Sequence, residues 1–191
     1  MRRFSCMVAA ALALPAFAGS PVAVEWKGLE QMPKAVARPF GGFLPDGSFA
    51  VAGGSYFEDG VKKYSDNVCV RSADGKWSKV GELPHDVADG VTCETPKGIF
   101  CAGGTDGEKK FADAFVLAVD NGKTVVTGLP PLPEPVVMGA AAADGTKVYV
   151  VASLKTYVLD TADPKEWKCV GPSLPHARAQ HVYIYYLLNC L

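Results

Sequence analysis

Six side chains of this sequence have the chemistry of a polar binding site: two arginines, two carboxylic acids, a histidine and a tyrosine. They are Arg38, Tyr56, Glu58, His85, Asp106 and Arg178. Guanidinium groups pair with carboxylates, and carboxyl, imidazole and phenol groups exchange protons with a bound molecule. These residues are therefore candidates for a polar binding site, but the sequence assigns a catalytic role to none of them.

Each candidate also has a purely structural alternative. The two arginines could bind backbone carbonyl groups between neighbouring units of the fold. His85 could be a capped, exposed loop residue, and Glu58 could be solvated within a charged loop. The position of each residue in the fold distinguishes the binding role from the structural one.

An internal repeat organises the chain. Gly53-Gly54 recurs as Gly103-Gly104, 50 residues later, and each pair follows a short apolar run. A third apolar run, residues 147–152, arrives on schedule but ends in Ser153-Leu154. Periods of this length are typical of folds that stack one supersecondary unit against the next.

Tryptophans mark the same repeat. They lie six or seven residues before an apolar residue and a proline: Trp26 before Met32-Pro33, Trp77 before Leu83-Pro84, and Trp167 before Leu174-Pro175. Further strands are expected at 66–70, 113–117 and 156–160, so each unit has four short strands. Asp-Gly and Asn-Gly dipeptides between the runs supply the positive φ angles of tight hairpin turns.

Four antiparallel strands in repeats of 42 to 50 residues predict propeller blades, because one twisted sheet buries both faces only against its neighbours. The diglycine and the tryptophan resemble the kelch repeat. We therefore expect an all-β, kelch-type β-propeller. In such a blade the loop before strand one (the 4–1 loop) and the loop between strands two and three (the 2–3 loop) emerge on the same face. The six candidates lie in these loops.

The expected divisions are a signal peptide (1–18), an N-terminal clasp strand of the last blade (19–33), three blades (34–84, 85–133 and 134–175) and the start of a fourth (176–191). At about 49 residues per blade, the chain supplies three to three and a half blades. The propeller is thus expected to be incomplete. A truncated chain, or a half-propeller completed by self-association, would account for this.

The N-terminus predicts export. Arg2 and Arg3 precede an apolar run from Met7 to Phe17, and Ala18 follows as a small residue suited to cleavage. We expect a periplasmic or secreted protein with no membrane association after cleavage, the alternative being an uncleaved anchor. The 19 basic and 20 acidic residues are scattered singly, which is not the pattern of a nucleic-acid-binding protein.

The cysteines predict neither a disulfide framework nor a metal site. Loss of Cys6 with the signal peptide would leave five cysteines, an odd number, and none lies at zinc-ligand spacing. Cys93 and Cys101 flank a turn and could face one another. A register shift of one residue would instead place them on opposite faces of the sheet.

The segment from Val51 to Val68, VAGGSYFEDGVKKYSDNV, resembles the bacterial cyclically permuted mutarotases, relatives of N-acetylneuraminate epimerase. In that family the first diglycine is followed by an aromatic and acidic loop, then by Lys-Lys-Tyr and an aspartate. The second copy, Ala102 to Gly107, supports the resemblance, which covers Trp26 to about His181.

This resemblance implies a six-bladed ring that interconverts the α and β anomers of free sialic acid, a small sugar, without a cofactor. Ring opening and reclosure need a base for the anomeric hydroxyl and an acid for the ring oxygen. The alternative is a kelch module without chemistry that binds a glycan or a protein. A sialidase-type hydrolase is disfavoured because repeated Asp-boxes are missing.

Overall fold

The computed structural model describes residues 25–171 and His176 of the 191-residue chain. Within these residues the regular secondary structure is entirely β. Several sequence predictions fall outside them: the signal peptide (1–18), residues 19–24 of the clasp, residues 172–175 of the third blade, residues 177–191 of the fourth, and the candidate Arg178.

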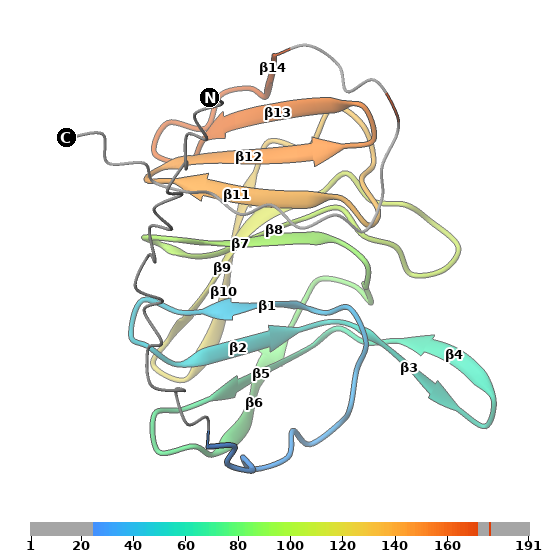
Figure 1. Cartoon of the computed structure of the whole chain (residues 1–191), viewed down its shortest axis with the longest axis vertical. Coiled ribbons are helices and arrows are strands. Elements are labelled where there is room, and N and C mark those ends of the chain that lie inside the picture. Colours follow the sequence, from blue (N-terminus) through green and yellow to red (C-terminus); the bar gives the residue numbers. More distant parts are fainter. Residues whose placement is uncertain (1–24, 172–175, 177–191) are drawn as a thin grey trace, which may run out of the picture.

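The first blade is an antiparallel sheet in the order β1-β2-β5-β6. Its strands are β1 (Phe40–Phe43), β2 (Phe49–Ala52), β5 (Asn67–Arg71) and β6 (Trp77–Glu82). Between β2 and β5 the chain forms a separate hairpin of β3 (Ser55–Glu58) and β4 (Val61–Tyr64). The sequence analysis expected a loop in this place. Figure 1 shows the hairpin extending beyond the blade.

The second and third blades repeat the same antiparallel arrangement. The second contains β7 (Val91–Thr95), β8 (Gly98–Ala102), β9 (Ala114–Asp120) and β10 (Lys123–Leu129). The third contains β11 (Ala140–Asp144), β12 (Lys147–Ala152), β13 (Lys155–Asp160) and β14 (Lys168–Val170). In Figure 1 the first strands of the three blades, β1, β7 and β11, lie one above another.

Alternating side chains pack each blade against its neighbours. On β8, Ile99 and Cys101 belong to the apolar cluster shared with the first blade, whereas Phe100 and Ala102 belong to the cluster shared with the third. Successive residues of a strand point to opposite faces, so a blade between two others is apolar on both. Fully burying a side chain such as Ile99 or Phe100 contributes roughly 1.5–3 kcal/mol to the free energy of unfolding. The stacking of the blades therefore supplies the core.

The two diglycines occupy equivalent positions, which confirms the repeat. The amide of Gly54 donates to the carbonyl of Val87 at 2.7 Å, and the amide of Gly104 donates to that of Val136 at 2.7 Å. Gly53 and Gly103 have φ of 70° and 66°. A Cβ atom on Gly103 would lie 2.2 Å from the Val136 oxygen. Glycine is needed here because the 4–1 loop of the next blade passes directly against it.

The third blade has no counterpart of these glycines. Ala152 pairs with Lys155, so β12 and β13 are joined directly by a tight turn at Ser153-Leu154. Ser153 takes the positive φ of that turn, 53°. The lost diglycine seen in the sequence thus corresponds to a shortened 2–3 connection. The third blade contributes no long 2–3 loop to the site.

The tryptophan repeat corresponds to a repeated hydrogen bond. The Trp167 indole donates to the carbonyl oxygen of Pro130 at 2.8 Å, and the Trp77 indole donates to that of Glu30 at 3.1 Å. Glu30 and Pro130 each stand three residues before the proline that opens a 4–1 loop. Residues 25–33 therefore contact the first blade as the end of a preceding blade would.

The clasp strand expected over 19–33 stays a prediction, because no strand of the last blade is among the described residues. Residues 25–33 form no strand, and Trp26 is 91% exposed. A strand in a sheet requires a neighbour that supplies its ladder of hydrogen bonds. None of the strands within residues 25–171 pairs with this segment.

The register of the second blade shows that Cys93 and Cys101 do not face one another. Cys101 pairs with Thr92 and Cys93 pairs with Phe100, so the two thiols lie on opposite faces of the sheet. Both are free, as are Cys69 and Cys169. Burial raises the pKa of the Cys93 thiol to about 12, and also raises that of Cys101. Both thiols are therefore core residues with little thiolate character.

Candidate functional site

In the first and second blades, the 4–1 loop is joined to the 2–3 loop. Ala37 pairs with Ser55 in the first blade, and Ala88 pairs with Thr105 in the second. The carbonyl of Val87 also accepts the Gly54 amide, which connects the two blades. These backbone bonds bring the loops that carry Arg38, Tyr56, Glu58, His85 and Asp106 to the same end of the molecule, as the topology predicted.

A buried carboxylate collects two cations at this end. Nη1 of Arg38 lies 3.1 Å from Oδ1 of Asp89, and Nζ of Lys62 lies 3.7 Å from Oδ2 of the same residue. The Asp89 side chain is only 3% exposed, whereas Arg38 and Lys62 are 46% and 41% exposed. The three side chains come from the 4–1 loop of the first blade, the β3–β4 hairpin and the 4–1 loop of the second blade. We call them the Asp89 cluster.

The backbone beneath the Asp89 cluster follows the blade repeat. Arg38, Asp89 and Met138 have φ of 53°, 63° and 58°, each shortly before the first strand of a blade. The Asp89 amide donates to the Arg38 carbonyl at 3.0 Å, and the Met138 amide donates to the Asp89 carbonyl at 2.7 Å. Residues other than glycine rarely adopt this left-handed backbone conformation. The bonds between blades hold them in it.

Tyr56 and Glu58 lie on the hairpin, and each has a lysine partner. Nζ of Lys34 lies 3.2 Å from the centre of the Tyr56 ring, a cation–π contact. Nζ of Lys63 lies 2.7 Å from Oε2 of Glu58, and this hydrogen bond lowers the pKa of the Glu58 carboxyl. Glu58 is thus an ionised surface group paired with a lysine, in agreement with its structural alternative.

His85 has both ring nitrogens engaged. Nε2 lies 3.0 Å from Oδ2 of Asp113, and Nδ1 lies 3.1 Å from the carbonyl oxygen of Asp86. Its ring also packs against Phe111, with the centres 4.1 Å apart. Both partners are hydrogen-bond acceptors. These contacts tie the 4–1 loop to the 2–3 loop of the second blade, which favours the structural alternative for His85.

Asp106 caps its own loop. Its Oδ1 accepts the amides of Lys109 at 2.7 Å and Glu108 at 2.9 Å, and these bonds lower the pKa of its carboxyl. Asp86 behaves in the opposite way. Burial raises the pKa of the Asp86 carboxyl, and the charges of Asp66 and Asp106 raise it further. A raised carboxyl pKa is a property that acid catalysts share, so Asp86 is a candidate proton donor.

On the third blade, Glu134 of the 4–1 loop pairs with Tyr157 of strand β13. The Tyr157 hydroxyl donates to Oε1 of Glu134 at 2.7 Å. Burial, together with this hydrogen bond, raises the pKa of Tyr157 to about 12. A cavity of about 150 Å³ opens beside Glu134, lined also by Lys110 and Val136. Glu134 thus adds a negative group to the loop end.

Sequence reasoning missed two of the three members of the Asp89 cluster. It selected Arg38 but neither Asp89 nor Lys62. Asp89 stands at the same position of the repeat as Arg38, one residue before Gly90 and the apolar strand β7, and this alignment was the available signal. Lys62 could not be found in this way because its role depends on the unexpected hairpin. Arg178 lies outside the described residues.

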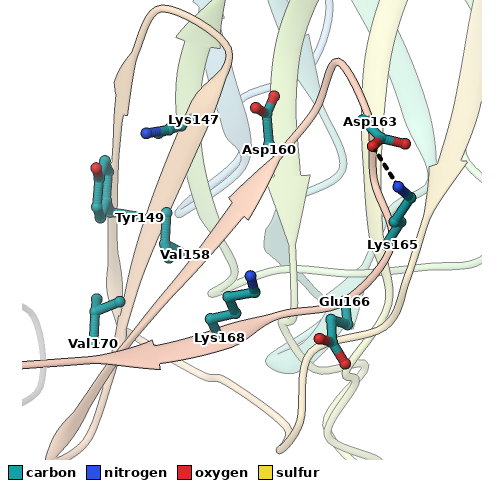
Figure 2. A pocket seen from close by; sticks show the side chains of 9 residues that line it. All are labelled: Lys147, Tyr149, Val158, Asp160, Asp163, Lys165, Glu166, Lys168 and Val170. Atoms are coloured by element: carbon teal, nitrogen blue, oxygen red, sulfur yellow. Dashed lines mark ion pairs between the residues drawn. The ribbon is translucent and has the colours of Figure 1, made fainter.

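A larger cavity, of about 580 Å³, lies on the outward face of the third blade rather than at the loop end. Figure 2 shows Tyr149, Val158 and Val170 at its apolar part, with charged side chains including Lys147 and Lys168 around them. By strand register, Tyr149 and Val158 correspond to Phe100 and Val116, which lie on the face of the second blade that packs against the third. None of the five candidates among the described residues lines this cavity. It is a blade-packing face, and we do not assign the site to it.

Two observations concern other classes of site. Among the described residues, no group of three or more histidine, cysteine, aspartate or glutamate side chains is arranged to hold a metal ion. No helix within residues 25–171 is long and apolar enough to cross a membrane.

Comparison with solved structures identifies the architecture. The chain is similar to the structure of YjhT, with a TM-score of 0.69 and 16% sequence identity. The match covers 81% of this chain and 58% of YjhT, so the chain spans less than two thirds of that protein. The likeness shows the fold, a kelch-type β-propeller, and confirms the predicted fold class. No family model and no curated protein matches the sequence.

Proposed function

We propose that this chain is the loop-bearing part of a sialic acid mutarotase-like propeller, which interconverts the anomers of N-acetylneuraminate by acid–base ring opening. The observation that carries the proposal is the Asp89 cluster. Two partly exposed cations and one buried carboxylate give it a net charge of +1 where the 4–1 and 2–3 loops meet. A cationic pair in this position suits the carboxylate of a sugar acid.

Two further observations support the proposal. The sequence from Val51 to Val68 resembles the mutarotase family, and the likeness to YjhT supports the kelch-type propeller fold that such a function requires. Mutarotation also needs a proton donor and a proton acceptor. Burial raises the pKa of the Asp86 carboxyl, which makes Asp86 the candidate donor, and backbone hydrogen bonds lower the pKa of Asp106, which makes it a candidate acceptor.

The proposal extends to location. An N-terminal signal peptide cleaved after Ala18 would place the protein in the periplasm or outside the cell, where free sialic acid is released from glycans. N-terminal sequencing of the protein expressed in a bacterium tests this directly. A mature chain that still began at Met1 in the cytoplasmic fraction would contradict it.

The activity is tested with freshly released α-N-acetylneuraminate. One-dimensional NMR follows the α and β anomers after a sialidase is quenched, with and without the purified full-length protein. We expect the protein to shorten the approach to equilibrium at least severalfold, and the R38Q variant to lose most of this effect. An unchanged rate with folded wild-type protein would rule out catalysis by this chain.

A non-catalytic binding module is the second candidate, and the hairpin favours it. Phe57 and Val61 are 74% and 59% exposed on β3 and β4. Exposed apolar side chains on a projecting hairpin are typical of a surface that contacts a partner. In this case the protein would bind sialylated glycans or a protein without accelerating anomerisation, and a glycan array together with the NMR assay separates the two functions.

A further inference from the structure

We propose that Asp89 is a positioning residue: its buried carboxylate holds Arg38 and Lys62 together as a preformed cation pair for the carboxylate of the substrate. The inference rests on the proposed function and adds to it a residue that does not itself touch the sugar.

The contacts show how one carboxylate can serve two cations. Its two oxygens are divided between them: Oδ1 lies 3.1 Å from Nη1 of Arg38, and Oδ2 lies 3.7 Å from Nζ of Lys62. Asp89 is buried at 3% exposure, while both cations keep more than two fifths of their side chains in solvent. The arrangement therefore faces outward with its positive groups and inward with its negative one.

Asp89 is itself fixed by the backbone. Its amide donates to the carbonyl of Arg38 at 3.0 Å, and its carbonyl accepts the amide of Met138 at 2.7 Å. The next residue, Gly90, lies against the ring of Phe40, since a Cβ there would be 2.3 Å from Cε1 of that ring. The backbone of Asp89, in the second blade, is thus hydrogen-bonded to the first and third blades. Lys62, by contrast, lies on a projecting hairpin.

This difference in rigidity is the reason for a positioning role. Long cationic side chains lose rotamer entropy when they are ordered, and a ligand that must order them binds more weakly. By ordering Arg38 and Lys62 before the substrate arrives, Asp89 removes part of that cost. It does so even though its charge partly offsets theirs.

The variant D89N tests this with little change in shape. Asparagine is nearly isosteric with aspartate and, like it, tolerates a φ near 63°. The matched control is D59N. Asp59 lies at the tip of the hairpin with a φ of 52° and is exposed, so this change removes the same charge from the same backbone conformation.

Binding of N-acetylneuraminate by the full-length protein is the first measurement. We expect D89N to weaken binding about tenfold, as when one partner of a desolvated charge pair is removed, and D59N to change it less than about twofold. In the R38Q background D89N should have a much smaller effect, because residues that act through one another are not additive. Equal or tighter binding by D89N, or the same loss in both backgrounds, would overturn the proposal.

A second measurement keeps this inference separate from the proposed function. The Arg38 Nε–H signal in NMR spectra reports whether the guanidinium is ordered, with no substrate present. We expect a sharp, exchange-protected signal in the wild type and in D59N, and loss of protection in D89N. If the Arg38 Nε–H signal stayed protected in D89N, the positioning role would be wrong whatever the activity of the protein. Failure of the wild type to bind the sugar would reject the proposed function instead.

Discussion

The residues that shape this protein most are those whose backbone has no freedom. Gly53 and Gly103 lie against the loop of the next blade, with φ near 70°. Arg38 and Asp89 take left-handed conformations without being glycine and are held by bonds between blades. The backbone conformation of each of these residues is therefore fixed by the packing of the neighbouring blade.

The substitution Gly103→Ala tests that constraint. The new Cβ would meet the Val136 oxygen at 2.2 Å in a left-handed conformation. We expect a loss of about 3 kcal/mol or more in the free energy of unfolding, measured by urea denaturation. The matched control is Gly47→Ala, at a φ of 83° with nothing within 4 Å, where only the backbone cost of about 1 kcal/mol applies. Equal losses in the two variants would contradict the close approach.

Sequence reasoning at this scale found what composition and the repeat can show. It identified the glycines because their spacing recurs, and Arg38 because a cation stands in a 4–1 loop. Its structural alternatives for Glu58 and His85 agree with the Lys63 and Asp113 contacts. It could not find the pairing of Lys62 with Asp89, because 27 residues separate them in the chain and the distance between them depends on a hairpin bend.

The elements divide into stacked strands and one projecting hairpin. Strands such as β8 and β12 were predictable because apolar runs bounded by turn residues have few other solutions. The β3–β4 hairpin was not, since Phe57 and Val61 are the only aliphatic or phenyl side chains in residues 56–63 and form no alternating apolar pattern. The clasp strand expected at 19–33 follows the repeat in sequence but has no strand beside it among the described residues.

Replacing residues 56–63 by Asn-Gly tests the independence of the hairpin. Ser55 and Tyr64 are paired partners, so a two-residue turn can join them. We expect stability to fall by less than about 1 kcal/mol, since the removed residues lie outside the blade cores. Binding of N-acetylneuraminate should be lost with Lys62 and Tyr56. Thermal unfolding and titration give the two results, and retained binding would show that the hairpin does not contribute to the site.

At the scale of the whole molecule, the blades form a linear stack in which each contacts its neighbours. One apolar cluster joins the first blade to the second, and another joins the second to the third. Stability in such arrays is approximately a sum of unit terms and nearest-neighbour terms. The kelch-type architecture was predictable because the repeat itself requires it.

Phe100→Ala tests the stack. Phe100 is fully buried between the second and third blades and packs near Trp167, with the ring centres 6.0 Å apart. We expect a loss of about 3–5 kcal/mol and, in hydrogen exchange, a larger loss of protection in β7–β13 than in β1 and β2. Phe57→Ala, at an exposed position, should change stability by less than about 0.5 kcal/mol. Uniform loss of protection across all strands would instead indicate one cooperative unit.

The left-handed residues before β1, β7 and β11 have a consequence for how such a protein can diversify. Their shape is imposed by amides and carbonyls, which are the same for every amino acid, while their side chains here are an arginine, an aspartate and a methionine. Each blade thus has one position at which the side chain can differ while the backbone conformation stays the same. Substitutions at Arg38, Asp89 and Met138 alone would then change what the loop end of the molecule recognises.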